Sequence, residues 1–242
     1  MQALMISDLH LTPSRPGIAR AFLSFLAHTA PEAQQLYILG DFFEYWVGDD
    51  AMEPFHEDIA SALKNYREAG HDIYFMPGNR DFALGRTFLK KAGMTWLNDP
   101  SLVTLNGETV LLMHGDSLCT GDPHYLRYRR IIRNPLVINI LRMTPLGYRK
   151  NLGRKIRENS QRAKQTKSPA IMDVTPGEVV KVMGKHQVVT MIHGHTHRPA
   201  IHDLTLTNGQ GAKRYVLGDW EEKGWFIRAD NNRLTLESFD IV

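Results

Sequence analysis

The segment from Gln2 to His10 reads Gln2-Ala3-Leu4-Met5-Ile6-Ser7-Asp8-Leu9-His10. Its first part is apolar nearly throughout, which is typical of a strand in a sheet that is covered on both faces. Two polar side chains, Asp8 and His10, follow that strand at once. The same apolar pattern recurs in Leu36–Leu39, Ile73–Met76, Val110–Met113 and Val188–Ile192. Counting Gln2–Ser7, the sequence therefore predicts five buried strands.

Helical patterns lie between these strands. Apolar residues recur at helical spacing in Ile18–Ala27 and in Pro54–Ala69, and the second run ends at Gly70. Gly85–Ala92 is a third candidate helix. This alternation predicts an α/β layered core. Near the C-terminus we expect three consecutive strands that extend a second, partly antiparallel sheet, and these are Tyr215–Leu217, Trp225–Ala229 and Leu234–Phe239.

The stretch from Asp122 to Ser168 interrupts the alternation. Its candidate helices are Tyr125–Ile132, Asn134–Met143 and Tyr148–Lys164. Residues 123–168 include 13 basic residues and one acidic residue, so they carry +12, and the net charge of +3 leaves −9 for the remainder. We therefore expect a core of residues 1–121 and 169–242, a helical insertion of residues 122–168, and two functional surfaces.

The composition excludes several classes of protein. Hydrophobic residues make up 43% of the 242 residues, which argues against a disordered or fibrous chain. Cys119 is the single cysteine, so an internal disulfide is excluded and a reducing compartment is favoured. There is no signal-peptide pattern, and the apolar run Leu136–Leu141 falls far short of the roughly 20 residues that span a bilayer. We expect a chain that is soluble or attached to a membrane surface.

Five short signatures follow the five predicted strands. They are Asp8-Leu9-His10, Gly40-Asp41, Gly78-Asn79-Arg80-Asp81, His114-Gly115-Asp116 and Gly194-His195-Thr196-His197. Loops at the carboxyl ends of strands converge on one crevice in an α/β sheet, so these polar side chains should face one another. Glycine lets the backbone turn sharply and approach closely. Most of these signatures alone are common in ordinary turns, and Gly194–His197 is rarer, but their occurrence together at five strand ends indicates a site.

The residue types in these signatures are those of a metal centre. Carboxylate and amide oxygens combined with imidazole nitrogens suit Mn²⁺ or Fe²⁺, with Zn²⁺ or Co²⁺ as alternatives. Seven candidate ligands exceed the needs of one ion, so we expect two ions with Asp41 as the bridging carboxylate. Two ions ~3.5–4 Å apart activate a water and stabilise charge on a phosphoryl oxygen. The sequence therefore predicts a hydrolase of phosphate esters or phosphoanhydrides.

Taken together, the signatures resemble those of the calcineurin-like metallophosphoesterases, and the resemblance extends from Asp8 to His197. It implies a two-sheet sandwich flanked by helices. It implies a first metal held by Asp8, His10, Asp41 and His197. It implies a second metal held by Asp41, Asn79, His114 and His195. The catalytic residues expected on this basis are Asp41, Asn79, Arg80 and His114.

Arg80 departs from the usual pattern of that family, in which a histidine occupies this position. Arginine cannot act as an acid near neutral pH, but it binds phosphate oxygens and offsets developing charge. A phosphate monoester leaving group, whose second pKa is near roughly 6, scarcely needs an acid. Arg80 therefore favours a pyrophosphate bond over a phosphodiester as the substrate. The alternative is a structural ion pair, for example with Asp81.

A narrower resemblance rests on Gly78–Asp81, on the run Gly40–Trp46 and on the basic insertion. These features are similar to the lipid A pyrophosphatases that hydrolyse UDP-2,3-diacylglucosamine, and the likeness covers almost the whole chain. It implies two Mn²⁺ ions per chain, the products UMP and 2,3-diacylglucosamine 1-phosphate, and a peripheral location on the cytoplasmic side of the inner membrane. The substrate contacts that it implies are Asn79, Arg80, Asp122, Ser160, Lys164, Lys167 and His195.

The insertion combines apolar and basic residues, as a lipid-linked nucleotide at an anionic membrane surface requires. Two simpler explanations stay open: helices that pack on the core with basic faces in water, and a nucleic-acid surface, which the few aromatics of the segment do not favour. A phosphodiesterase or nuclease of the same superfamily, and a catalytically silent metal-binding scaffold, are the competing functions. The aromatic residues that follow Asp41 either line the pocket or pack beneath the loop, and they are Phe42, Phe43, Tyr45 and Trp46.

Overall fold

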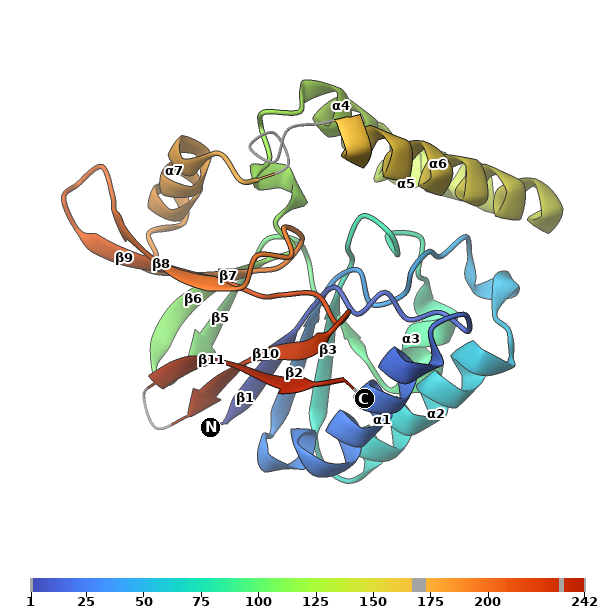
Figure 1. Cartoon of the computed structure of the whole chain (residues 1–242), viewed down its shortest axis with the longest axis horizontal. Coiled ribbons are helices and arrows are strands. Elements are labelled where there is room, and N and C mark those ends of the chain that lie inside the picture. Colours follow the sequence, from blue (N-terminus) through green and yellow to red (C-terminus); the bar gives the residue numbers. More distant parts are fainter. Residues whose placement is uncertain (1, 167–172, 231–232, 242) are drawn as a thin grey trace.

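The computed structural model describes residues 2–166, 173–230 and 233–241. Two sheets pack face to face, and helices cover their outer faces (Figure 1). The first sheet has the order β11-β10-β1-β2-β3-β4, and the second has the order β5-β6-β7-β9-β8. The expected fold class, a two-sheet sandwich flanked by helices, is confirmed.

The elements of the two sheets and of the helices around them have the following bounds. The first sheet contains β1 (Ala3–Ile6), β2 (Gln35–Leu39), β3 (Asp72–Met76), β4 (Thr95–Trp96), β10 (Lys223–Asp230) and β11 (Arg233–Asp240). The second contains β5 (Ser101–Leu105), β6 (Glu108–Met113), β7 (Thr190–His193), β8 (Ala200–Thr205) and β9 (Gly211–Val216). The flanking helices are α1 (Pro16–His28), α2 (Pro54–Glu68), α3 (Arg86–Ala92) and α7 (Pro176–His186), and the short 3₁₀ turns are η1 (Ala30–Glu32), η2 (Asp49–Ala51) and η3 (Asp116–Leu118).

Strand β1 shows why the core strands are apolar throughout. Leu4 and Ile6 belong to the hydrophobic cluster that joins the first sheet to α1, α2 and α3. Ala3 and Met5, which point to the opposite face, belong to the cluster between the two sheets. A third cluster joins the second sheet to α7. Because both faces of β1 are covered, alternation of polar and apolar residues disappears from its sequence.

The five predicted strands and the three predicted core helices are confirmed, but the expectation for the C-terminal strands is wrong in part. Strand β9 lies in the second sheet and pairs with β7, whereas β10 and β11 join the first sheet beside β1. Both faces of β10 are apolar, so it fits there: Phe226 packs in the cluster beneath the helices and Ile227 packs between the sheets. Strands β5 and β8 and helix α7 are further elements that were not predicted.

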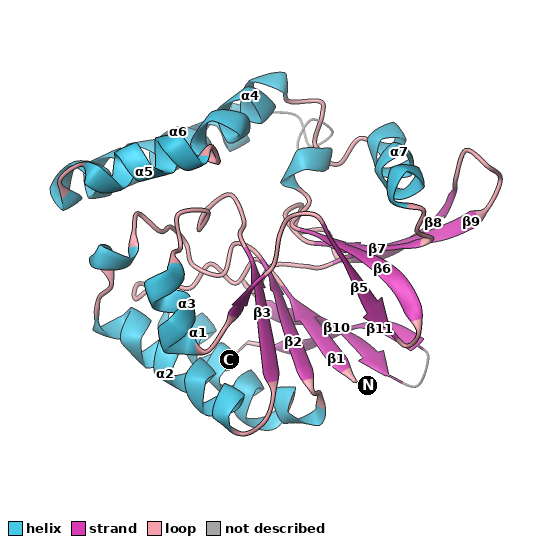
Figure 2. Cartoon of the chain, turned by 180° about the vertical axis from the view of Figure 1, so that it is seen from behind, coloured by secondary structure: helices cyan, strands magenta, loops and turns pink. Residues whose placement is uncertain are grey.

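Three helices follow η3: α4 (Pro123–Ile132), α5 (Pro135–Met143) and α6 (Leu146–Thr166). They confirm the helices expected between Tyr125 and Lys164. They lie over the loops at the carboxyl ends of β1, β2 and β3 (Figures 1 and 2). No residue of α4 or α5, both of which the structure describes in full, is buried. The division of the chain into a core and an insertion of residues 122–168 stays a prediction.

Trp220 fixes the chain where it crosses from the second sheet to the first. Its side chain is 1% exposed, and its ring lies 5.5 Å from that of Phe25 and 5.3 Å from that of Phe239. Its indole N–H donates to the carbonyl of Trp225 at 3.0 Å. One side chain therefore joins α1, the crossing segment and the edge of the first sheet.

We expect Trp220→Ala to lower the free energy of unfolding by about 3–5 kcal/mol, because a large buried aromatic is replaced by a cavity. Urea denaturation followed by circular dichroism measures this change. Trp96→Ala is the control, because Trp96 is 42% exposed and should contribute much less. Equal losses in the two variants would contradict this account of the crossing.

Candidate active site

The five signatures lie in the loops that follow β1, β2, β3, β6 and β7. The first two loops run side by side, because the amide of Asp8 donates to the carbonyl of Gly40 at 3.1 Å and the amide of His10 donates to the carbonyl of Asp41 at 3.0 Å. Glycine is required where the loops meet. A Cβ on Gly78 would lie 2.1 Å from Asp41 Oδ1, which leaves no room for a side chain.

Backbone strain is concentrated in these loops. Among the described residues, seven that are not glycine have a positive φ, a conformation that is unfavourable for L-residues. Five of the seven belong to the signatures, and they are Asp8 (57°), His10 (50°), Asp41 (51°), His195 (69°) and His197 (56°). Strain of this kind persists only where the surrounding structure enforces it, and it collects at functional sites.

The first group of candidate ligands is Asp8, His10 and His197, whose ligand atoms lie within 4.8 Å of one another. The Nε2 atoms of the two histidines are 3.3 Å apart, and Asp8 Oδ1 lies 3.4 Å from His197 Nε2. Asp219, which the sequence analysis missed, approaches His197 Nδ1 to 3.0 Å. The recurrence of Leu39-Gly40-Asp41 as Leu217-Gly218-Asp219 after another buried strand is a signal that could have identified it.

The second group is Asp41, His114 and His195. Asn79 joins it, because Asn79 Oδ1 lies 3.0 Å from His114 Nε2. The other ring nitrogen of His114 is 2.9 Å from the carbonyl of Leu39, to which it donates. When the ring is neutral, this bond leaves Nε2 as an acceptor that faces Asn79 Oδ1 and, at 3.7 Å, Asp41 Oδ1. All seven predicted ligands are therefore brought together.

Both groups fit divalent cations. Each presents acceptor atoms to the same small volume, and a cation among them would satisfy atoms that otherwise oppose one another. Burial lowers the pKa of His195 to about 3, so its ring is neutral, as a ligand must be. Although burial opposes the change, contacts with Asp219 and Asp8 raise the pKa of His197 to about 10, so these carboxylates stabilise positive charge at the first group. The bridging role of Asp41 stays a prediction.

Asp81 holds two of the loops in place. It is fully buried, its Oδ1 accepts the amide of Gly78 at 2.7 Å, and its Oδ2 accepts the amide of Phe42 at 2.7 Å. The suggested ion pair between Arg80 and Asp81 is therefore wrong. Arg80 instead donates from Nη1 to Glu44 Oε1 at 2.8 Å, and its backbone amide donates to Asp41 Oδ1 at 2.8 Å.

The predicted substrate contacts are only partly described. Asp122 is the N-cap of α4, where its Oδ1 accepts the amide of Tyr125 at 3.0 Å. Tyr125 in turn stacks on His195 with 6.2 Å between ring centroids, which brings α4 to the second ligand group. Ser160 and Lys164 lie in α6, of which only the backbone is described there, and Lys167 lies outside the described residues. Their roles stay predictions.

Several arginines of the segment that contains α4, α5 and α6 form ion pairs with acidic residues of the core. Arg129 Nε lies 2.7 Å from Asp116 Oδ2, and Arg133 Nη1 lies 3.2 Å from Asp99 Oδ2. Both aspartates are buried, and a buried carboxylate is strongly destabilising without a partner. Arg149 is likewise paired with an acidic residue that follows β2. The charge asymmetry therefore reflects, in part, pairing between the helices and the core.

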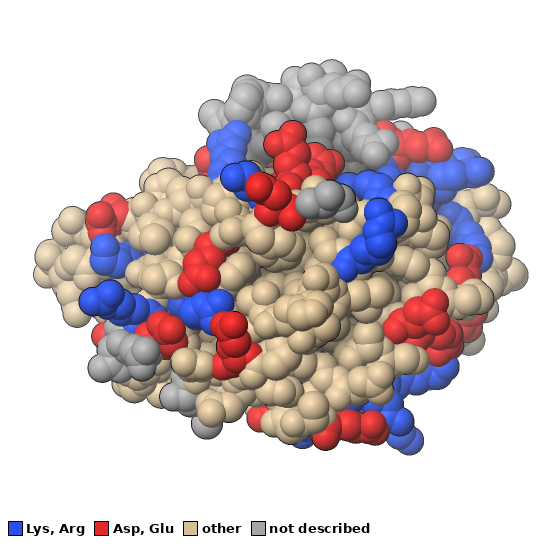
Figure 3. Space-filling view, turned by 60° about the horizontal axis from the view of Figure 1, so that its bottom comes forward, with Lys and Arg blue, Asp and Glu red and all other residues tan. Residues whose placement is uncertain are grey.

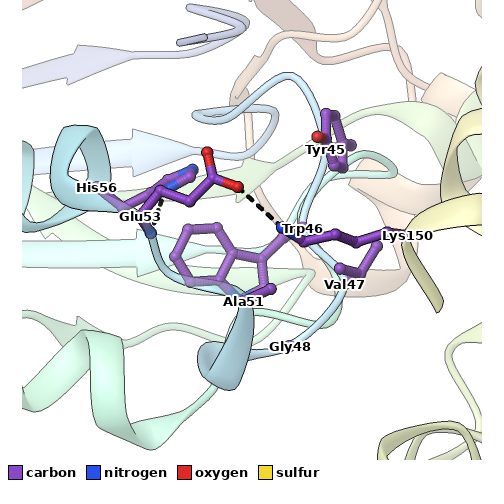
Figure 4. Close-up of a pocket in the computed structure, with 8 residues that line it drawn as sticks. All are labelled: Tyr45, Trp46, Val47, Gly48, Ala51, Glu53, His56 and Lys150. Atoms are coloured by element: carbon purple, nitrogen blue, oxygen red, sulfur yellow. Dashed lines mark hydrogen bonds and ion pairs between the residues drawn. The ribbon is translucent and has the colours of Figure 1, made fainter. Parts of the chain in front are cut away.

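The aromatic run after Asp41 has two roles. Phe42 and Phe43 are fully buried beneath the loop. Tyr45 and Trp46 instead line a small pocket beside α6 (Figure 4). The pocket lining is Tyr45, Trp46, Val47, Gly48, Ala51, Glu53, His56 and Lys150, and an ion pair of 2.9 Å joins Lys150 Nζ to Glu53 Oε1. The run therefore both supports the ligand loop and faces the helices above it.

Comparison with known proteins agrees with this site. The sequence profile of the calcineurin-like phosphoesterases matches residues 1–199. The chain therefore belongs to the calcineurin-like phosphoesterase family, which confirms the resemblance noted from its signatures.

Three relatives of nearly the same length as this chain share one name. A protein of Ectopseudomonas mendocina is 54% identical over 239 residues, which cover 99% of this chain and 98% of the relative. One of Pseudomonas syringae is 55% identical over 99% of this chain and 96% of its own length. One of Stutzerimonas stutzeri is 57% identical over 95% of both chains. All three are named UDP-2,3-diacylglucosamine hydrolase.

We expect two Mn²⁺ ions to bind to the metal-stripped protein, and Asp219→Ala to weaken one of the two binding events by about 10- to 100-fold. The reason is that a carboxylate behind a ligating histidine orients the ring and raises its basicity. Isothermal titration calorimetry measures both affinities.

Asp203→Ala is the matched control for that experiment, because Asp203 pairs with Lys213 on the neighbouring strand and lies in an exposed position. It should leave both affinities unchanged. An Asp219→Ala variant with unaltered affinities, or a stoichiometry of one ion, would contradict the assignment.

Proposed function

We propose that this chain hydrolyses the pyrophosphate bond of UDP-2,3-diacylglucosamine and releases UMP and 2,3-diacylglucosamine 1-phosphate, a step of lipid A biosynthesis. The proposal rests on one observation. Two groups of candidate metal ligands, Asp8-His10-His197 and Asp41-His114-His195, lie in loops at the ends of the two sheets. The names of the relatives support the substrate, because they cover nearly the whole chain at 54–57% identity.

The proposed cofactor is a pair of Mn²⁺ ions, which the mixed set of oxygen and nitrogen ligands suits, and Fe²⁺, Co²⁺ and Zn²⁺ are the alternatives. Ions bound there supply charge that acidifies a water and offsets the charge of a phosphoryl oxygen. Asp41, Asn79 and His114 present their acceptor atoms to this centre. Arg80, beside Asp41, is proposed to bind an oxygen of the diphosphate through its guanidinium group.

Helices α4, α5 and α6 are proposed to form a lid over the acyl chains and the head of the lipid. Two features support this role. The ring of Tyr125 on α4 stacks on His195, and Arg157 on α6 lies 2.9 Å from Glu44, so both helices reach the candidate centre. This role agrees with general chemistry, because acyl chains favour an apolar environment and a diphosphate favours guanidinium groups.

One side of α5 carries exposed apolar residues that suit a bilayer. Leu136, Ile140 and Met143 are 71%, 64% and 86% exposed, and their spacing places them on the same side of the helix. Within the described ranges, no helix is both long enough and apolar enough to cross a membrane. We propose that α5 rests on the anionic cytoplasmic surface of the inner membrane as a peripheral contact.

The opposite end of the molecule differs from α5. There, Lys and Arg side chains are interspersed with Asp and Glu (Figure 3). Mixed charge of this kind suits a face that is directed to water, and it does not form the basic stripe that a nucleic-acid partner requires. The proposed partners are the lipid-linked nucleotide and the membrane surface, and this face of the molecule gives no support to a nucleic-acid partner.

The substrate is tested by comparing diacylated UDP-glucosamine with UDP-N-acetylglucosamine in the presence of Mn²⁺. We expect turnover of the diacylated compound to be at least about 100-fold greater, because each buried CH₂ contributes about 0.8 kcal/mol. A chelator should abolish turnover and Mn²⁺ should restore it. Products formed in ¹⁸O water identify the bond that is cut.

Each negative result of that assay has a distinct meaning. Equal turnover of the two compounds would contradict the lid while leaving the metal chemistry intact. No release of UMP from either compound, by a protein that holds its ions, would contradict the proposed function.

The membrane contact is tested by sedimentation with vesicles that contain phosphatidylglycerol. Leu136→Glu should reduce the vesicle-bound fraction several-fold, because a charge replaces an apolar side chain at the proposed interface. Leu102→Glu is the matched control, because Leu102 is also exposed, at 49%, but lies on β5. Binding that is equally reduced in both variants, or in neither, would contradict the role of α5.

A further inference from the structure

Glu44 is a buried carboxylate on which three arginines from distant parts of the chain converge. It is 5% exposed and lies in the loop after β2. Arg15, which precedes α1, donates from Nη2 to Glu44 Oε2 at 2.7 Å. Two further partners approach Glu44 Oε1, with Arg80 Nη1 at 2.8 Å and Arg157 Nε at 2.9 Å.

The number of arginines exceeds what the burial of Glu44 requires. A buried carboxylate must be paired, and one well-placed guanidinium group satisfies it. Three guanidinium groups carry more positive charge than the single carboxylate of Glu44 offsets, and Glu221, 3.5 Å from Arg15 Nη1, offsets part of the remainder. That excess lies beside the second ligand group, because Arg80 Nε is 3.9 Å from Asp41 Oδ2. An excess of positive charge next to a candidate metal centre suits a polyanionic substrate.

The backbone around Glu44 is held firmly by the core. The amide of Glu44 donates to the carbonyl of Leu11 at 3.1 Å, and the amide of Trp46 donates to the carbonyl of Arg80 at 3.0 Å. Arginine side chains, by contrast, are long and have many rotamers, so they need a fixed partner to keep one orientation. Glu44 supplies this fixed point for guanidinium groups that come from a loop and from α6.

We propose that Glu44 is a positioning residue that aims the guanidinium groups of Arg80 and Arg157 at the diphosphate of the substrate. Through Arg157 it also joins helix α6 to the loops that carry the candidate metal ligands. This inference rests on the proposed function, since the diphosphate is the group that the arginines would bind. A second ion pair between the same loop and α6, Glu53 with Lys150, lies away from the ligand groups and offers a direct comparison.

The test is Glu44→Gln, which keeps the size of the side chain and removes its charge. We expect kcat to fall about 10- to 100-fold, the range for loss of an outer-shell partner. We expect KM for the diacylated substrate to stay the same or decrease, because a negative charge near the diphosphate is removed. A variant that had merely loosened α6 would instead show a higher KM.

Two comparisons distinguish a role in positioning the arginines from a role in holding α6 in place. Glu53→Gln breaks the neighbouring ion pair with α6 and should leave kcat within about twofold of the wild-type value. In the background of Arg80→Ala with Arg157→Ala, adding Glu44→Gln should change kcat by less than about threefold, because the groups through which Glu44 acts are gone. Retention of two Mn²⁺ ions by Glu44→Gln is part of the expected result.

The affinity for UMP, measured by calorimetry with Mn²⁺ present, gives a readout that does not depend on turnover. We expect Glu44→Gln to bind UMP as tightly as the wild type or more tightly. Absence of turnover by the wild-type protein would count against the proposed function, whereas weaker UMP binding by Glu44→Gln would overturn the present inference. An unchanged kcat in Glu44→Gln, or an equal loss of kcat in Glu53→Gln, would also overturn it. The same holds if Glu44→Gln lowers kcat as much in the background of Arg80→Ala with Arg157→Ala as in the wild type.

Discussion

Buried carboxylates at the carboxyl ends of the strands impose the requirement that the rest of the structure meets. Burial of a charge is strongly destabilising unless hydrogen bonds or opposite charges compensate it. Asp81 is compensated by the backbone amides of Gly78 and Phe42. Asp116 is compensated by Arg129 of α4 and by Arg133, which directly follows that helix, and Glu44 by arginines that include one of α6. For Asp8 and its neighbours, the same requirement is met by histidines and fits a metal cation.

This requirement explains why the charge of the chain is divided so unevenly. Several buried carboxylates of the core, among them Asp99 and Asp116, lie where the sheets end, and the positive charge of residues 123–168 includes arginines that pair with them. Arg129 and Arg133 bind Asp99 and Asp116 from one side. Pairing of this kind fastens α4 and α6 over the candidate centre while one side of α5 stays exposed. The same helices can therefore face the reaction centre and an external surface.

The candidate centre also depends on the contact between the two sheets. Asp8, Asp41 and Asn79 come from loops of the first sheet, whereas His114 and His195 come from loops of the second. Their separations are therefore set by the hydrophobic cluster between the sheets, to which Met5 and Leu112 contribute. A close-packed interior of this kind resists deformation, and it can hold the ligand residues in the strained positive-φ conformations observed here.

By itself, the sequence determined the parts of this protein that depend on local patterns. Apolar runs predicted the core strands, helical spacing predicted the core helices, and the signatures at strand ends predicted the seven candidate ligands. The tertiary structure alone decided which sheet receives β10, how Asp219 supports His197, and that Arg80 pairs with Glu44 and not with its neighbour Asp81. These features join residues that are far apart in the chain or that compete for partners, and the pairing of a buried charge depends on which other charges the fold brings within reach.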